Sequence, residues 1–185
     1  MRVGLGTGST VAYLLPALAE RGLTLRCVAT SQATEREASR LGLAVEPFDQ
    51  LDRLDIAIDG ADQVTPDHWL IKGGGGAHVR EKIVAAAARR FVVIVSANKL
   101  VAALAPPVPV ELLSFGLQST LEALSPCQPR AGAPPSPDGG VIADYLGPTE
   151  DPATVAARLD ATPGVVGHGL FEPALVSDVI VGDRP

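Results

Sequence analysis

The sequence is poor in several features that would each have pointed to a particular class of protein. Its two cysteines, Cys27 and Cys127, lie far apart and form no Cys-x-x-Cys pattern, which argues against a disulfide framework and predicts a reduced, cytoplasmic protein. No apolar run reaches the roughly 18 residues expected of a membrane span, and no signal peptide opens the chain. We therefore expect no membrane partner.

Positive charge is also scarce. The net charge of −6 and the isoelectric point near 5.0 argue against nucleic acid or an anionic membrane as the main partner. Only Lys72, Lys82 and Lys99 are lysines among the 15 basic residues. The three histidines show no metal-ligand spacing with other donors, so the sequence predicts no metal site.

Apolar material is plentiful, since hydrophobic residues make up 46% of the 185 residues. Apolar strands alternate with helices in the first half of the chain. The strands are predicted over 3–5, 23–29, 54–58 and 91–95, and the helices over 10–21, 35–41 and 77–90. Pro16 should kink or restart the first helix. This order predicts an α/β fold with a doubly wound, mainly parallel, Rossmann-like sheet that binds ligands at the carboxyl ends of its strands.

The character of the chain changes after Leu104. The segment 105–109 is predicted to be a rigid proline connector, followed by a helix over 116–124, a turn-rich loop over 131–140, a strand over 141–144 and a helix from Pro152 to about Ala161. Residues 176–181 are apolar enough to return to the main sheet. We predict a catalytic domain formed by 1–104 plus 167–185, with a smaller inserted α+β domain at 105–166.

A glycine-rich hydroxyl loop, Gly6-Thr7-Gly8-Ser9-Thr10, follows the first strand. Glycine lets backbone amides approach an anion closely, so the loop is suited to a phosphate. A dinucleotide fingerprint is disfavoured, because Ser9 replaces its third glycine and the second strand ends without an acidic residue. A purely structural strand–helix turn remains the alternative.

Two aspartates, Asp59 and Asp62, follow the strand at 54–58. An aspartate after a strand is usually a turn or capping residue. However, Lys72 and Glu81 fall in the same layer of loops if the sheet is as predicted. Carboxylates near one lysine can have their pKa values driven apart, which separates acid from base roles.

Four consecutive glycines, Gly73 to Gly76, follow Lys72. They bury almost nothing and cost backbone entropy, so a nest of amide donors for an oxyanion explains them better than packing does. Glu81 then lies in the first turns of the helix predicted at 77–90, where the macrodipole favours a carboxylate. A surface glutamate that only stabilises the helix is the alternative.

The stretches VGLGTGST, IDGADQV, LIKGGGGAHVREKIVA, NKLV, PVPVE and PGVVGHGLF, in this order, resemble the type A family of ribose-5-phosphate isomerase. The resemblance runs from Val3 to Gly182. It implies an enzyme that interconverts D-ribose 5-phosphate and D-ribulose 5-phosphate through an enediolate, in the non-oxidative pentose phosphate pathway. It further implies a small-molecule sugar phosphate as ligand, no cofactor, and a homodimer or homotetramer. A related sugar-phosphate deaminase and a non-catalytic sugar-phosphate sensor are the alternatives.

The resemblance also assigns roles to residues. It implies that Glu81 is the proton acceptor and that Asp59, Asp62 and Lys72 complete the catalytic set. The implied substrate-binding residues are Thr7, Gly8, Ser9, Thr10, Asp59, Gly60, Ala61, Asp62, Lys72, Gly73, Gly74, Gly75 and Lys99. The chain departs from the family at Gln63, where the family commonly has an acidic residue, and at Ser96-Ala97-Asn98, before Lys99, where it usually has Asp-x-Ser.

Overall fold

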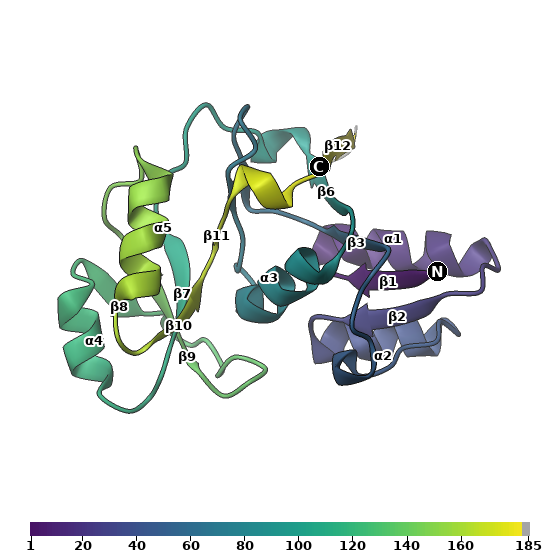
Figure 1. The fold of residues 1–185 in the computed structure, drawn as a ribbon, viewed down its shortest axis with the longest axis horizontal. Helices are drawn as coiled ribbons and strands as arrows, with labels where there is room; N and C mark the ends of the chain where they lie inside the picture. Colours follow the sequence, from purple (N-terminus) through teal and green to yellow (C-terminus); the bar gives the residue numbers. More distant parts are fainter. Residues whose placement is uncertain (183–185) are drawn as a thin grey trace. The chain divides into compact units, whose positions relative to one another are not determined.

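The computed structural model describes residues 1–182, and the chain folds into two compact units (Figure 1). The first unit contains 1–60, 80–97 and the C-terminal segment from 174, and the second contains 61–79 and 98–173. The inserted domain expected at 105–166 stays a prediction. The second unit contains 105–166 together with 61–79, 98–104 and 167–173.

The first unit is built on a five-stranded parallel sheet with the strand order β12-β6-β3-β1-β2. Its elements are β1 (Arg2–Leu5), α1 (Ser9–Glu20), β2 (Arg26–Ala29), α2 (Gln32–Arg40), the 3-10 turn η1 (Phe48–Gln50), β3 (Ile56–Asp59), β6 (Phe91–Ser96) and β12 (Asp178–Gly182). The return of the C-terminal strand to this sheet, predicted for 176–181, is confirmed by the pairing of β12 with β6. The doubly wound parallel fold is also confirmed.

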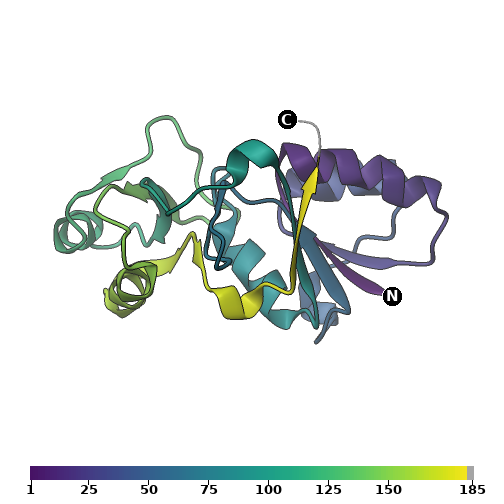
Figure 2. The same ribbon diagram turned by 90° about the horizontal axis from the view of Figure 1, so that it is seen from above.

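Helices cover both faces of the parallel sheet because successive side chains of a strand point to opposite faces. Val3 and Leu5 of β1 pack in one core cluster with residues of α1 and α2. Gly4, between them, faces the other side, where a Cβ would lie 2.4 Å from Val84 of α3 (His78–Ala87). Figure 2 shows α1 and α3 on opposite sides of the strands.

The helices of the first unit begin close to the positions that the sequence predicts. The α2 helix starts after Ser31, whose hydroxyl caps it by accepting from the Thr34 amide at 3.2 Å. The α1 helix is continuous through Pro16, so of the two predicted effects the restart is wrong, and a kink at Pro16 stays a prediction. Pro16 is in the second turn, where its ring removes one backbone donor without ending the helix.

The second unit contains two antiparallel sheets. One has the order β10-β7-β9-β8 and the other β11-β5-β4. The elements are β4 (Gln63–Val64), β5 (Leu70–Ile71), β7 (Val108–Leu112), α4 (Leu117–Ala123), β8 (Cys127–Pro129), β9 (Val141–Tyr145), α5 (Pro152–Ala161), β10 (Val165–His168) and β11 (Leu170–Phe171). The short turns η2 (Ala97–Lys99) and η3 (Pro173–Leu175) cross the boundaries between units.

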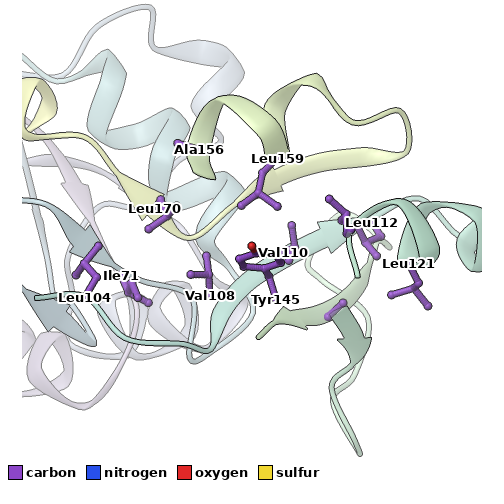
Figure 3. Packing of buried hydrophobic residues seen from close by; sticks show 12 residues of the cluster. Ile71, Leu104, Val108, Val110, Leu112, Leu121, Tyr145, Ala156, Leu159 and Leu170 are labelled. Atoms are coloured by element: carbon purple, nitrogen blue, oxygen red, sulfur yellow. The ribbon is translucent and has the colours of Figure 1, made fainter. Parts of the chain in front are cut away.

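One apolar cluster forms the core of this unit (Figure 3). Val108, Val110 and Leu112 of β7 are fully buried in it, together with Tyr145 of β9 and Leu159 of α5. The prediction of a rigid connector at 105–109 is therefore wrong beyond residue 107. The alternating apolar residues of β7 make it a central strand despite Pro109, because burial of one face outweighs the missing proline amide.

Candidate active site

The loop Gly6–Thr10 follows β1 at the carboxyl edge of the parallel sheet. The amide of Thr7 donates to Asp59 Oδ1 at 3.0 Å, and the amide of Gly60 donates to the same oxygen at 2.7 Å. Asp59 ends β3 and is only 3% exposed. A Cβ on Gly6 would lie 1.9 Å from Asp59 Cγ, so only glycine fits beside this carboxylate. Asp59 thus holds the loop in place through the Thr7 amide and its own turn through the Gly60 amide.

Threonine hydroxyls complete the support of this loop. Thr7 Oγ1 lies 2.7 Å from Thr30 Oγ1, and Thr34 Oγ1 donates to the carbonyl oxygen of Gly6 at 2.8 Å. Thr30 and Thr34 were not among the predicted site residues. The Thr30-Ser31 pair carries a helix-start signal, but nothing in the sequence shows that these hydroxyls turn back to the first loop.

The exposed end of the loop is also the start of α1. Gly8 has φ +109°, a conformation that favours glycine, and both Gly8 and Ser9 are exposed. Within the described residues, no side chain caps the amides of the first turn. A Cβ on Gly60 would lie 3.9 Å from Thr10, so the Asp59-Gly60 turn and this loop are neighbours. Helix amides and hydroxyls gathered in this way are suited to an anion.

The second glycine loop, Gly73–Gly76, belongs to the second unit. The amide of Gly74 donates to Asp62 Oδ2 at 2.8 Å, and the amide of Asp62 donates to the Ile71 carbonyl at 2.8 Å. Gly73 has φ +102°, and a Cβ there would lie 2.7 Å from His78 Nδ1. Asp62 is half-buried, whereas Gly74 and Gly75 are exposed.

Lys72 precedes this loop and is 3% exposed. Its amide donates to the Gly169 carbonyl at 2.8 Å, and its ammonium lies 5.4 Å from the centre of the Phe171 ring. A cation over an aromatic face is electrostatically favoured, so Phe171 of β11 helps to hold the ammonium. Phe171 was not predicted, because its contact with Lys72 depends on the pairing of β11 with β5.

Glu81 lies in the first turn of α3 and is 4% exposed. Burying a carboxylate is costly unless it is compensated by charge or hydrogen bonds, so the alternative of an exposed, helix-stabilising glutamate is ruled out. Buried ionisable groups concentrate at functional sites. Lys99 lies in η2 and is half-buried. Its contact with a phosphate stays a prediction.

Neither cysteine supplies a thiolate nucleophile. Burial raises the pKa of the Cys127 thiol to about 11, and it also raises the pKa of the Cys27 thiol. Among the described residues, no group of three or more His, Cys, Asp or Glu side chains is arranged to hold a metal ion. No helix of residues 1–182 is long and apolar enough to cross a membrane.

The fold and these loops define an α/β protein of the class that binds small anions at strand ends and helix N-termini. A sequence model of ribose 5-phosphate isomerase A (phosphoriboisomerase A) matches residues 26–185. This chain belongs to the ribose 5-phosphate isomerase A family.

Individual relatives are similar over nearly the whole chain. The ribose-5-phosphate isomerase A of Nitrobacter hamburgensis is 45% identical over 92% of this chain and 82% of its own length. Among solved structures, ribose 5-phosphate isomerase A of Methanocaldococcus jannaschii is 34% identical, with a TM-score of 0.92 over 100% of this chain and 88% of that chain. A D-ribose-5-phosphate isomerase in complex with phospho-erythronic acid is 35% identical, with a TM-score of 0.93 over 100% and 87% of the two chains.

Proposed function

We propose that this protein is an aldose–ketose isomerase that interconverts D-ribose 5-phosphate and D-ribulose 5-phosphate in the non-oxidative pentose phosphate pathway. The observation that carries the proposal is the match to the isomerase family over residues 26–185. The buried carboxylates, the buried lysine and the two glycine loops supply the groups that such a reaction needs.

Glu81 is the base in this proposal. It removes the proton from C2 of the open-chain aldose, next to the C1 aldehyde, and the electrons of that bond form an enediolate. It then returns the proton to C1, while the proton of the C2 hydroxyl moves to the oxygen on C1. The product is the ketose with its carbonyl at C2. No cofactor is needed, because the neighbouring carbonyl already acidifies the C2 proton.

The negative charge of the enediolate oxygens requires fixed donors. We assign this role to the Lys72 ammonium and to the amides of the loop Gly73–Gly75. The amide of Gly74 already donates to Asp62, so the amide of Gly75, an exposed residue, is the stronger candidate for binding an oxyanion. The relative bound to phospho-erythronic acid supports the enediolate step itself, since a carboxylate carries two oxygens in one plane, as an enediolate does.

The remaining residues bind and orient the sugar. Asp59 exchanges protons at the sugar oxygens and assists ring opening, and Asp62 orients hydroxyl groups. Thr7–Thr10 and Lys99 hold the phosphate. Gly60 and Ala61, in the turn between Asp59 and Asp62, also contact the substrate. We further propose a metal-independent, cytoplasmic homodimer or homotetramer.

An assay of the full chain tests the proposal directly. Ribose 5-phosphate is supplied in D₂O and the ribulose 5-phosphate formed is examined by NMR. Conversion with deuterium at C1 is expected, because a proton held by a carboxylate exchanges with solvent before it is returned. Free ribose should react far more slowly, and treatment with a chelator should leave the rate unchanged.

Three outcomes would contradict parts of this proposal. Binding of ribose 5-phosphate without turnover would indicate a sensor, and release of ammonia from an amino-sugar phosphate would indicate a deaminase. Loss of activity on chelation, restored by one divalent ion, would overturn metal independence.

A further inference from the structure

Arg130 contacts the glycine loop Gly73–Gly76 from the four-stranded sheet of the second unit. It directly follows β8, and its Nη1 donates to the carbonyl oxygens of Gly73 and Gly74, both at 3.0 Å. Its Nε and Nη2 donate to the carboxylate of Asp144 at 3.0 and 2.6 Å. The planar guanidinium therefore donates to a carboxylate and two carbonyls from three separate nitrogens, a spread that the single nitrogen of a lysine cannot reproduce.

The sheet fixes both members of this ion pair. Asp144 lies on β9 opposite Gln128 of β8, and the amide of Arg130 donates to the Ile142 carbonyl at 2.9 Å. The side chains of Arg130 and Asp144 are only 22% and 15% exposed. A bidentate, shielded pair of this kind is strong and geometrically specific. The guanidinium is thus held at a constant place beside the loop.

The position of the guanidinium determines where the loop amides point. In a planar trans peptide the carbonyl and the amide of one unit point in opposite directions. Because the carbonyls of Gly73 and Gly74 face Arg130, the amides of Gly74 and Gly75 point away from it. The Gly74 amide meets Asp62 Oδ2 on that far side at 2.8 Å. The exposed Gly75 amide is directed by the same contact.

We propose that Arg130, held by Asp144, is a positioning residue that orients the Gly75 amide toward the enediolate oxygens. This inference rests on the proposed function, because it assumes that the loop meets the reacting sugar. Among the described residues, the hydrogen bonds of the Arg130 side chain go to the loop and to Asp144. Its loss should therefore lower kcat more than it raises KM.

The test compares wild type with Arg130→Met, Arg130→Lys and the double variant Arg130→Met/Asp144→Asn. Arg158→Met is the matched control, since Arg158 also belongs to the second unit and donates to a backbone carbonyl, that of Ala123, at 3.0 Å. For each protein, kcat and KM for ribose 5-phosphate, the melting temperature and amide hydrogen exchange of the loop peptide are measured. The exchange measurement needs no activity.

We expect Arg130→Met to lower kcat by about 10–100-fold, the scale of an ångström-sized misplacement at a reacting centre. Loop amides should exchange faster, while Arg158→Met changes neither quantity. Arg130→Lys should recover only part of kcat. Asp144→Asn removes the carboxylate charge that Arg130→Met leaves without its partner. The double variant should therefore melt closer to wild type than Arg130→Met does, while its kcat stays low.

Two results would overturn the proposal: unchanged loop exchange in Arg130→Met, or full recovery of kcat in the double variant, which would show that only the stranded charge mattered. If Arg130→Met does not fold, the kcat and the loop exchange of the double variant and of Arg130→Lys are compared with those of wild type instead. A wild-type protein without isomerase activity would instead overturn the proposed function, and the exchange rates alone would then decide whether Arg130 orders the loop.

Discussion

The two glycine-rich loops are built alike and supported differently. In each, an aspartate carboxylate accepts a loop amide, from Thr7 to Asp59 at 3.0 Å and from Gly74 to Asp62 at 2.8 Å. The first carboxylate is buried and leaves no room for a side chain on Gly6. The second is half-buried, and its loop is also held through its carbonyls by an arginine.

The difference in support matches a difference in proposed task. Neutral hydroxyls and one buried carboxylate fix the first loop, which leaves the N-terminal amides of α1 for a phosphate. The second loop is held between the Asp62 carboxylate and the Arg130 guanidinium. Hydrogen bonds to these two charged groups orient its peptide planes. We therefore expect changes near the first loop to alter affinity, and changes in the segment that starts at Lys72 to alter turnover.

The largest expected effect is that of Glu81→Gln. The amide cannot accept the C2 proton, so kcat should fall by roughly 10²–10⁴-fold, the usual reach of general base catalysis. Ligand affinity and melting temperature should be retained. Glu35→Gln is the matched control, because Glu35 is a first-turn glutamate of α2 that is exposed. Activity of Glu81→Gln within about threefold of wild type would remove Glu81 from the mechanism.

Lys99→Ala tests the assignment of the phosphate. Losing one charge-assisted contact should cost about 1.5–3 kcal/mol, or roughly 10–150-fold in affinity for ribose 5-phosphate. The affinity for free ribose should change little, since it carries no phosphate. Calorimetric titration of ribose 5-phosphate and of ribose into wild type and Lys99→Ala measures the four affinities. Equal losses for the two ligands would place the phosphate elsewhere.

Gly6→Ala and Gly74→Ala compare the two loops directly. The new Cβ at Gly6 would overlap the buried Asp59 carboxylate, so the free energy of unfolding should fall by about 1–3 kcal/mol, as for other overpacked sites. At Gly74 the new Cβ would lie 3.0 Å from Asp62 Oδ1, which is more exposed and can shift. Urea unfolding should therefore show the smaller loss for Gly74→Ala, and equal losses would contradict the comparison.

The smallest effect is expected at the ion pair of Arg26 and Glu46, whose side chains are 52% and 21% exposed, more than those of the pair beside the second loop. The hydrogen bond from Arg26, helped by its charge, lowers the pKa of Glu46 below 4.5. The folded state therefore gains stability above about pH 4.5, and this gain is lost as the pH falls through the lowered pKa. The melting temperature of Glu46→Gln should be slightly below that of wild type at pH 7, and the two should be equal at acidic pH.

Measurements at different salt concentrations provide the control for the comparison of Glu46→Gln with wild type. The difference in melting temperature between Glu46→Gln and wild type should shrink at high ionic strength, because exposed pairs are screened. A difference that grows as the pH falls would contradict the assigned sign.

The sequence by itself determined the parallel sheet and most of its helices, because hydrophobic periodicity and capping residues such as Ser31 act over a few neighbours. It also indicated both glycine loops, since runs of glycine have few explanations other than unusual backbone or close approach to a ligand.

Tertiary structure alone decided what supports those loops. Thr34 and Arg130 reach the loops from 28 and 57 residues away in the chain, and Phe171 reaches Lys72 from a distant strand. No local pattern marks these three residues. Strand β7 likewise forms despite Pro109, because β9 and β10 pair with it on either side and its residues are buried there. Contacts between distant segments depend on which strands pair, and that pairing is a property of the folded chain rather than of any short stretch of its sequence.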